Sequence, residues 1–312
     1  MTGKPTWMPH PSAAKIVLPA GATDTHSHVF GPAAAFPYAA ADKPQPADAP
    51  AEALFALHDA MGIDRGVIVQ SGVHGFDNSA VADAIAKRPG LYLGVALAPA
   101  DVSDEALARL SGQGFRAIRF NYMAHLPPGA DADRLRALAP RLAAHGWHLQ
   151  VHMQADLIED LAPVLGDLPI PVVIDHMGRV DASLGMNQAP FTALLRLMER
   201  DGLWVKVSGA ERASRLDPPY ADAAPFAAKL VAEFPEQVLW GLDWPHPNFR
   251  ADPPDDGDLV NLLPVIAPSD AALHRLMVDN PSRLYQFPKA QDCASPRACR
   301  PDRQGAWATG GG

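Results

Sequence analysis

The sequence contains little cysteine and no long stretch of positive charge. Only Cys293 and Cys299 occur in 312 residues, both close to the C-terminal end. The rest of the chain therefore has no disulfide framework and no cysteine-ligated metal site. Lysine and arginine form no basic stripe, and the formal charge is −9 at pH 7. An acidic chain without such a stripe is not expected to bind nucleic acid.

The sequence also lacks the features of a secreted or membrane-spanning chain. Prolines and His10 interrupt the first 20 residues, which have no charged start followed by an apolar run, so no signal peptide is predicted. No apolar run reaches the roughly 18 residues of a membrane span. These absences predict a soluble, cytoplasmic protein with no membrane or nucleic-acid partner, and they leave the formation of a homo-oligomer open.

Short apolar runs that end in polar residues alternate with amphipathic stretches of helical length. The runs expected as strands are Ala22–Val29, Gly66–Gly72, Leu93–Ala98, Ala117–Tyr122, His148–Met153, Val172–Met177, Leu203–Gly209 and Val238–Trp244. The stretches expected as helices are Ala51–Met61, Ser79–Lys87, Asp104–Ser111, Asp131–His145, Leu157–Leu165, Phe191–Arg200 and Phe226–Phe234. This alternation is typical of an α/β fold with a parallel sheet, and it predicts a (β/α)8 TIM barrel.

The end of the first strand separates the barrel from the other common parallel architecture. A doubly wound open sheet usually carries a glycine-rich phosphate loop at this point, whereas this strand ends in Asp-Thr-His-Ser-His, residues 24–28. We predict an N-terminal extension over residues 1–20 and a single catalytic domain over residues 21–288. Residues 289–312 are predicted to be a disordered tail, because they are polar and rich in Gly, Pro and Arg.

Histidines at strand ends indicate a divalent metal. His26 and His28 are two residues apart on a strand, so their side chains lie on one face. This pair alone is weak evidence, but His152 and Asp243 lie at two further strand ends, where barrel enzymes carry their chemistry. Imidazole and carboxylate ligands favour zinc, with manganese or cobalt as alternatives. The predicted ligands are therefore His26, His28, His152 and Asp243.

Asp243 and His176 are the predicted catalytic residues. A metal at this site would lower the pKa of its bound water and polarise a substrate carbonyl. Asp243 would then take the proton of that water and pass it to the leaving oxygen. His176, at the end of the sixth predicted strand, would orient the water or the developing oxyanion.

A second group of strand-end residues is cationic and includes Arg119, Arg179 and Arg212. Arginine forks onto carboxylates, so together these residues indicate a substrate with one or two acidic groups. Each arginine taken alone is more typical of a structural ion pair, and the hydroxyl residues nearby are equally compatible with ordinary loop or core roles. The predicted substrate-binding residues are Tyr38, Ser71, Arg119, His125, Arg179, Arg212 and His246.

Four motifs carry a resemblance to a known family. They are Asp-Thr-His-Ser-His-Val-Phe-Gly-Pro (24–32), Phe-Pro-Tyr (36–38), Asp-His-Met-Gly-Arg (175–179) and Gly-Leu-Asp-Trp-Pro-His-Pro-Asn (241–248). These motifs resemble the amidohydrolase superfamily, in its branch around 2-pyrone-4,6-dicarboxylate lactonase, over residues 20–287. The resemblance implies a barrel of the amidohydrolase type, the same histidine and aspartate positions, and hydrolysis of a small anionic lactone.

Two positions depart from the pattern of that lactonase. It has a tyrosine where this chain has His152, and it works without a tightly held metal, whereas metal-dependent members of the superfamily carry a histidine there. It also has an arginine where this chain has His125. The resemblance therefore implies a metal-dependent relative that acts on a lactone with a different or single acidic group, such as a muconolactone, a sulfomuconolactone or a sugar-acid lactone. Lactone isomerisation and metal-dependent decarboxylation are the alternatives.

Overall fold

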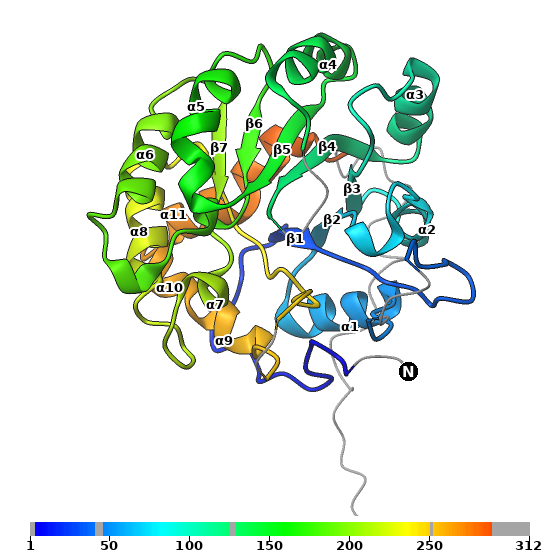
Figure 1. Ribbon diagram of the computed structural model, residues 1–312. Helices are drawn as coiled ribbons and strands as arrows, with labels where there is room; N and C mark the ends of the chain where they lie inside the picture. Colours follow the sequence, from blue (N-terminus) through cyan, green and yellow to red (C-terminus); the bar gives the residue numbers. More distant parts are fainter. Residues whose placement is uncertain (1–3, 41–45, 125–128, 250–251, 289–312) are drawn as a thin grey trace, which may run out of the picture.

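The computed structural model describes residues 4–40, 46–124, 129–249 and 252–288. Its centre is an eight-stranded sheet in which neighbours pair in parallel and in chain order, as Figure 1 shows. The strands are β1 (Thr23–Ser27), β2 (Arg65–Val69), β3 (Tyr92–Ala96), β4 (Phe115–Tyr122), β5 (His148–Met153), β6 (Val172–Ile174), β7 (Leu203–Lys206) and β8 (Val238–Leu239). The predicted TIM barrel is confirmed.

Hydrogen bonds between β1 and the chain after β8 close the barrel. The N–H of Thr25 donates to the carbonyl of Trp240 at 2.9 Å, and the N–H of Asp243 donates to the carbonyl of His26 at 2.7 Å. At Gly241, a Cβ would lie 2.6 Å from the backbone nitrogen of His26, closer than real contacts allow. Glycine is therefore required where the two ends of the sheet meet.

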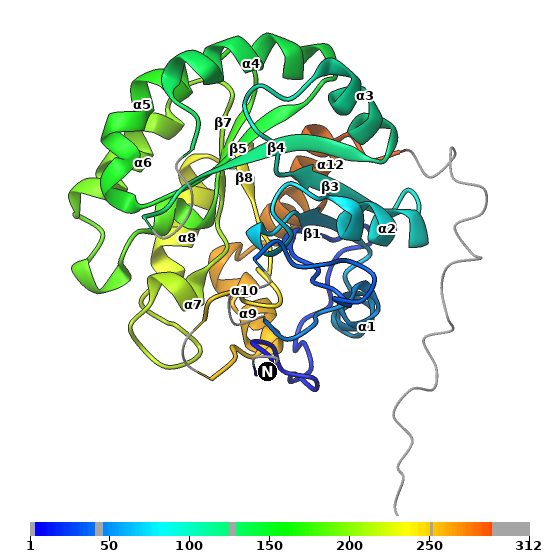
Figure 2. The same cartoon turned by 45° about the vertical axis from the view of Figure 1, so that its right-hand side comes forward.

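Helices surround the barrel on its outside, as Figures 1 and 2 show. Those that follow strands are α1 (Ala51–Met61), α2 (Ser79–Lys87), α3 (Asp104–Gly112), α4 (Ala132–Ala144), α5 (Ile158–Gly166), α6 (Ala189–Met198), α7 (Ala210–Ala213) and α8 (Ala224–Glu233). After β8 come α9 (Asp256–Asn261), α10 (Leu263–Ile266), α11 (Asp270–His274) and α12 (Asn280–Tyr285). None of the helices in the described part of the chain has the length and apolarity that a membrane span requires.

Apolar side chains fill one end of the barrel interior. Val67 and Val69 of β2 belong to an inner cluster, whereas Ile68 between them belongs to the larger outer core. This is the alternation expected of a strand that is buried on both faces. Tyr285 of α12 joins the inner cluster and packs edge-on against His148, with 5.0 Å between ring centroids.

Six of the eight predicted strands extend too far at their C-terminal ends; only the fourth and fifth end where predicted. The structure ends the sixth, seventh and eighth at Ile174, Lys206 and Leu239. The 3₁₀ segment η3 (His176–Arg179) follows β6 and starts with a left-handed φ of 50° at His176, and Asp243 has a φ of 63°. Left-handed residues do not continue a strand, so the catalytic candidates lie in turns just beyond the sheet.

The N-terminal segment packs beside the turn that carries Asp243. The hydroxyl of Thr6 donates to the carbonyl of Pro245, and the rings of Trp7 and Trp244 lie 5.2 Å apart. The predicted division into extension, catalytic domain and tail stays a prediction, and its tail, residues 289–312, lies outside the described residues.

Candidate active site

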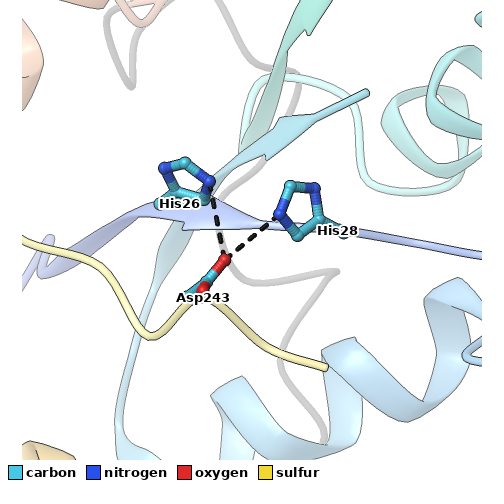
Figure 3. A group of neighbouring side chains, drawn as sticks. All are labelled: His26, His28 and Asp243. Carbon is cyan, nitrogen blue, oxygen red and sulfur yellow. Dashed lines mark hydrogen bonds and ion pairs between the residues drawn. The ribbon is translucent and has the colours of Figure 1, made fainter. Parts of the chain in front are cut away.

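Strand β1 and the turn after β8 bring the first three predicted ligands together. His26 of β1 and His28, one residue beyond the end of β1, both point toward the carboxylate of Asp243, as Figure 3 shows. The Nε2 atoms of His26 and His28 lie 3.7 and 3.2 Å from Asp243 Oδ1. The Nε2 atom of His176 also lies 3.7 Å from this oxygen. These side chains are almost completely buried.

The Nδ1 atoms of the site histidines face oxygen atoms of the protein. His28 Nδ1 lies 2.7 Å from the carbonyl oxygen of Val69, which can only accept, so Nδ1 carries the proton. His152 Nδ1 lies 3.1 Å from Asn121 Oδ1, and His176 Nδ1 lies 2.9 Å from the hydroxyl of Ser208. This arrangement leaves the Nε2 atoms of His28 and His152 with a lone pair.

The arrangement fits a divalent cation. The Nε2 atoms of His26 and His152 are buried without a hydrogen-bond partner among the described residues, and a bare His28 Nε2 faces a carboxylate oxygen. A cation bound here would satisfy the Nε2 atoms of all three histidines, because a metal accepts lone pairs from imidazole nitrogens and from carboxylate oxygens alike. Ligands at about 2.0–2.1 Å from a tetrahedral zinc ion lie roughly 3.3 Å from one another. The observed separations of 3.2 and 3.7 Å around Asp243 Oδ1 are close to that value.

The electrostatics of the site keep the imidazoles of His26, His152 and His176 neutral. Burial, helped by the charge of Lys206, lowers the pKa of His26 to about 3. Burial also holds the pKa values of His152 and His176 well below their usual range. Burial opposes ionisation of Asp243, but the charge of Arg212 and the contacts with the surrounding imidazoles outweigh it and hold its pKa well below the usual range. The site therefore offers neutral imidazoles and an ionised carboxylate, the forms that bind metals.

A family model that describes an amidohydrolase matches the sequence from residue 23 to residue 287. The matched range begins at β1 and ends just beyond α12, so it includes all eight strands and the His-Asp cluster.

The chain belongs to the amidohydrolase family.

Two relatives of this amidohydrolase are named as hydrolases of a pyrone dicarboxylate and of a sulfomuconolactone. It is 42% identical over 288 residues to 2-pyrone-4,6-dicarboxylate hydrolase of Comamonas testosteroni, covering 89% of this chain and 94% of the relative. It is 39% identical over 274 residues to 4-sulfomuconolactone hydrolase of Rhizobium radiobacter, covering 86% and 91%. A zinc-bound amidohydrolase structure from Burkholderia multivorans, 19% identical, superposes with a TM-score of 0.67 over 86% of this chain and 100% of that one, which shows the shared fold.

The three predicted substrate arginines occupy different environments in the amidohydrolase. Arg119 is buried, and its Nε lies 2.8 Å from Asp175 Oδ2. Arg212 pairs with Asp243 through its Nε, which lies 3.4 Å from a carboxylate oxygen of Glu211. Arg179 is half-buried and forms no ion pair with any residue that the structure describes. Of the three guanidinium groups, that of Arg179 is the one without a carboxylate partner in the described chain.

The other predicted substrate residues also bond within the protein. The Tyr38 hydroxyl donates to Asp48 at 2.7 Å, and Ser71 caps the 3₁₀ segment η1 (Gly72–His74). His246 is fully buried, with Nε2 3.1 Å from Asp256 Oδ1. Burial opposes protonation of His246, but the charge of Asp256 outweighs it and raises the pKa to about 9. His125 lies outside the described residues.

The predicted fourth ligand, His152, packs against His176 and does not belong to the cluster of His26, His28 and Asp243. Its ring stands edge-on to that of His176, with 5.8 Å between centroids, and the described metal-binding groups do not include it. His152, Asn121 and Arg179 are half-buried, whereas His26 and Asp243 are buried. The side of the cluster that His152 and Arg179 form is therefore partly accessible to solvent.

Sequence reasoning missed a buried polar layer directly behind His26. Asp175, Lys206 and Gln150 are completely buried, and Asp175 forms a second candidate cation group with His26 and His176. A lysine inside the apolar run of β7 was the available signal, because lysine is almost never fully buried without a partner. The polar partners of Lys206 come from β1, from β5 and from the turn after β6. No local sequence pattern reveals that these segments meet.

Proposed function

We propose that this amidohydrolase opens a small acidic lactone by hydrolysis. The observation that carries the proposal is the convergence of three imidazole Nε2 atoms on Asp243, beside the guanidinium of Arg179, which has no carboxylate partner in the described chain. The names of two of its relatives, hydrolases of a pyrone dicarboxylate and of 4-sulfomuconolactone, support the same reaction class.

A divalent metal, with zinc as the first choice, is part of the proposal. His26, His28 and Asp243 are the proposed core ligands. His152 is the proposed fourth ligand, because its Nε2, like that of His26, is buried without a partner among the described residues. A metal held there would acidify a bound water and polarise the lactone carbonyl.

Asp243 is the proposed general base. It accepts the proton of the water as the water oxygen bonds to the lactone carbonyl carbon, and the proton then goes to the ring oxygen when the carbonyl carbon–oxygen bond breaks. Its depressed pKa keeps it ionised at neutral pH, so it is ready to accept. Arg212 holds Oδ2 and thereby fixes the carboxylate plane. His176, with Nδ1 held by Ser208, orients the water or the oxyanion.

Proton release distinguishes this reaction from its alternatives. With 4-sulfomuconolactone or 2-pyrone-4,6-dicarboxylate in weakly buffered indicator solution, we expect about one proton per lactone opened, because the product is a new carboxylic acid. Isomerisation would consume the lactone without net proton release, and decarboxylation would release carbon dioxide. Either result would refute hydrolysis.

Arg179 is proposed to hold an acidic group of the substrate. Arg179→Met should raise KM by about 10- to 100-fold, the loss of one charge-assisted hydrogen-bonding group, and change kcat much less. Arg215→Met is the matched control, since Arg215 is exposed and pairs with Asp181 at 2.7 Å. Unchanged KM in the Arg179 variant, measured by steady-state kinetics, would contradict the anion-binding role.

A further inference from the structure

Four buried polar residues form a layer behind His26. Asp175 Oδ2 accepts from Arg119 Nε at 2.8 Å and from Gln150 Nε2 at 3.1 Å. Lys206 Nζ donates to the carbonyl of Thr25 and to Gln150 Oε1, both at 2.9 Å. Burial opposes ionisation of Asp175, but its contact with His26 and the charges of Arg119 and Lys206 outweigh this and hold its pKa well below its usual range.

The Nδ1 atom of His26 lies between a donor and an acceptor of this layer. Lys206 Nζ is 3.2 Å away and Asp175 Oδ1 is 3.3 Å away. A hydrogen bond from Lys206 requires a bare Nδ1, which puts the proton on Nε2. A hydrogen bond to Asp175 requires the proton on Nδ1, which leaves Nε2 bare. The two contacts therefore demand opposite tautomers of His26.

Two buried atoms without hydrogen bonds decide between these tautomers. Asp175 Oδ1 and His26 Nε2 both lack a hydrogen-bond partner among the residues that the structure describes. If Nδ1 carries the proton, the Asp175 Oδ1 atom at 3.3 Å is the acceptor available to it, and Nε2 faces Asp243 with a free lone pair. The opposite tautomer leaves a buried carboxylate oxygen with only the distant Lys206 ammonium, at 3.5 Å. An unsatisfied buried acceptor is costly, so the first tautomer is favoured.

We propose that Asp175 is a positioning residue that sets the tautomer of His26 and so presents Nε2 to the metal. Lys206 neutralises Asp175 and directs its third proton to that carboxylate. Carboxylates in this position orient a ligating imidazole and raise its basicity. The inference rests on the proposed metal site, because it assigns the contact that makes His26 a ligand.

Asp175→Asn provides a sharp test, since its amide orientation is constrained. Arg119 and Gln150 both donate to the Oδ2 position, so the amide oxygen must face them and the NH₂ group must face His26. This NH₂ group donates to Nδ1 and forces the proton onto Nε2. We expect the zinc affinity of the metal-free protein, measured by competition with a chromophoric chelator, to fall by about 10- to 100-fold.

Lys206→Met should act in the opposite way. It removes the competing donor and leaves Asp175 Oδ1 to His26, so zinc affinity should be retained or raised, with a stoichiometry of one. Asp256→Asn is the matched control, because Asp256 is equally buried and pairs with His246 rather than with a ligand. Equal weakening by Asp175→Asn and Lys206→Met would indicate general damage and overturn the proposal. A second zinc bound by Lys206→Met would also overturn it, by making Asp175 a ligand.

The tautomer itself can be read without a metal. In ¹⁵N-histidine NMR spectra of the metal-free protein, with His26 assigned through the His26→Gln variant, we expect an Nδ1–H tautomer in the wild type and in Lys206→Met. An Nε2–H tautomer is expected in Asp175→Asn. An unchanged tautomer in Asp175→Asn would refute the positioning role. A wild type that shows the expected tautomer but binds no zinc would instead refute the metal-dependent mechanism.

Discussion

Asp243→Asn is expected to lower kcat for lactone opening by about 10²- to 10⁴-fold, the contribution of a positioned general base. Asparagine keeps the shape of the side chain but accepts no proton at neutral pH. It also removes the charge that Arg212 and the imidazoles face. The rate is measured by proton release at saturating lactone, together with the zinc content of the variant.

A second substitution separates loss of the base from loss of the fold. Asp255→Asn removes a carboxylate from the same region of the chain, one that binds the Ser12 N–H at 2.9 Å and caps α9. We expect near-normal kcat for this variant. If Asp243→Asn loses less than tenfold in kcat while retaining zinc, Asp243 is not the base, and the proposed mechanism fails.

Removal of the metal is expected to have an effect of similar size. Dialysis against a chelator should reduce kcat/KM by about 10³-fold or more, because a Lewis acid at a carbonyl contributes several kcal/mol to transition-state stabilisation. One equivalent of zinc per chain should restore the activity. Activity that is indifferent to chelation, in a protein with no bound metal, would overturn the metal-dependent mechanism.

The histidine variants locate the fourth ligand. His152→Ala is expected to lose zinc, whereas His176→Ala is expected to keep zinc and lose kcat, since His176 is proposed to orient the water. His274→Ala, at an exposed position on α11, is the control and should change neither. If His152→Ala retains zinc and His176→Ala loses it, the fourth ligand is His176 and not His152. The Nε2 atom of His176 lies 3.7 Å from Asp243 Oδ1.

The core of the site could be predicted from the sequence because its signals are local. His26 and His28 share a face through the two-residue period of a strand, and Asp243 follows a strand end within a distinctive Gly-Leu-Asp motif. In a parallel barrel all such ends meet on one rim. Pattern and topology were therefore sufficient to predict that these three residues lie together, and in the structure their ligand atoms are within 4.8 Å of one another.

The role of each arginine could not be predicted in the same way. In the sequence, three arginines are equivalent strand-end cations. In the structure, Asp175 pairs with Arg119 and Asp243 pairs with Arg212, whereas Arg179 has no carboxylate partner in the described chain. Those distances depend on where distant strands and turns lie.

The sequence alone determined the barrel, the order of its strands and the three residues at the centre of the cluster, because strand periodicity and strand ends are properties of neighbouring residues. The tertiary structure decided which nitrogen of each imidazole is free. Protons on a buried histidine follow from donors and acceptors contributed by other strands: Val69 for His28, Asn121 for His152 and, in the tautomer that we propose, Asp175 for His26. Such contacts exist only once the barrel has closed.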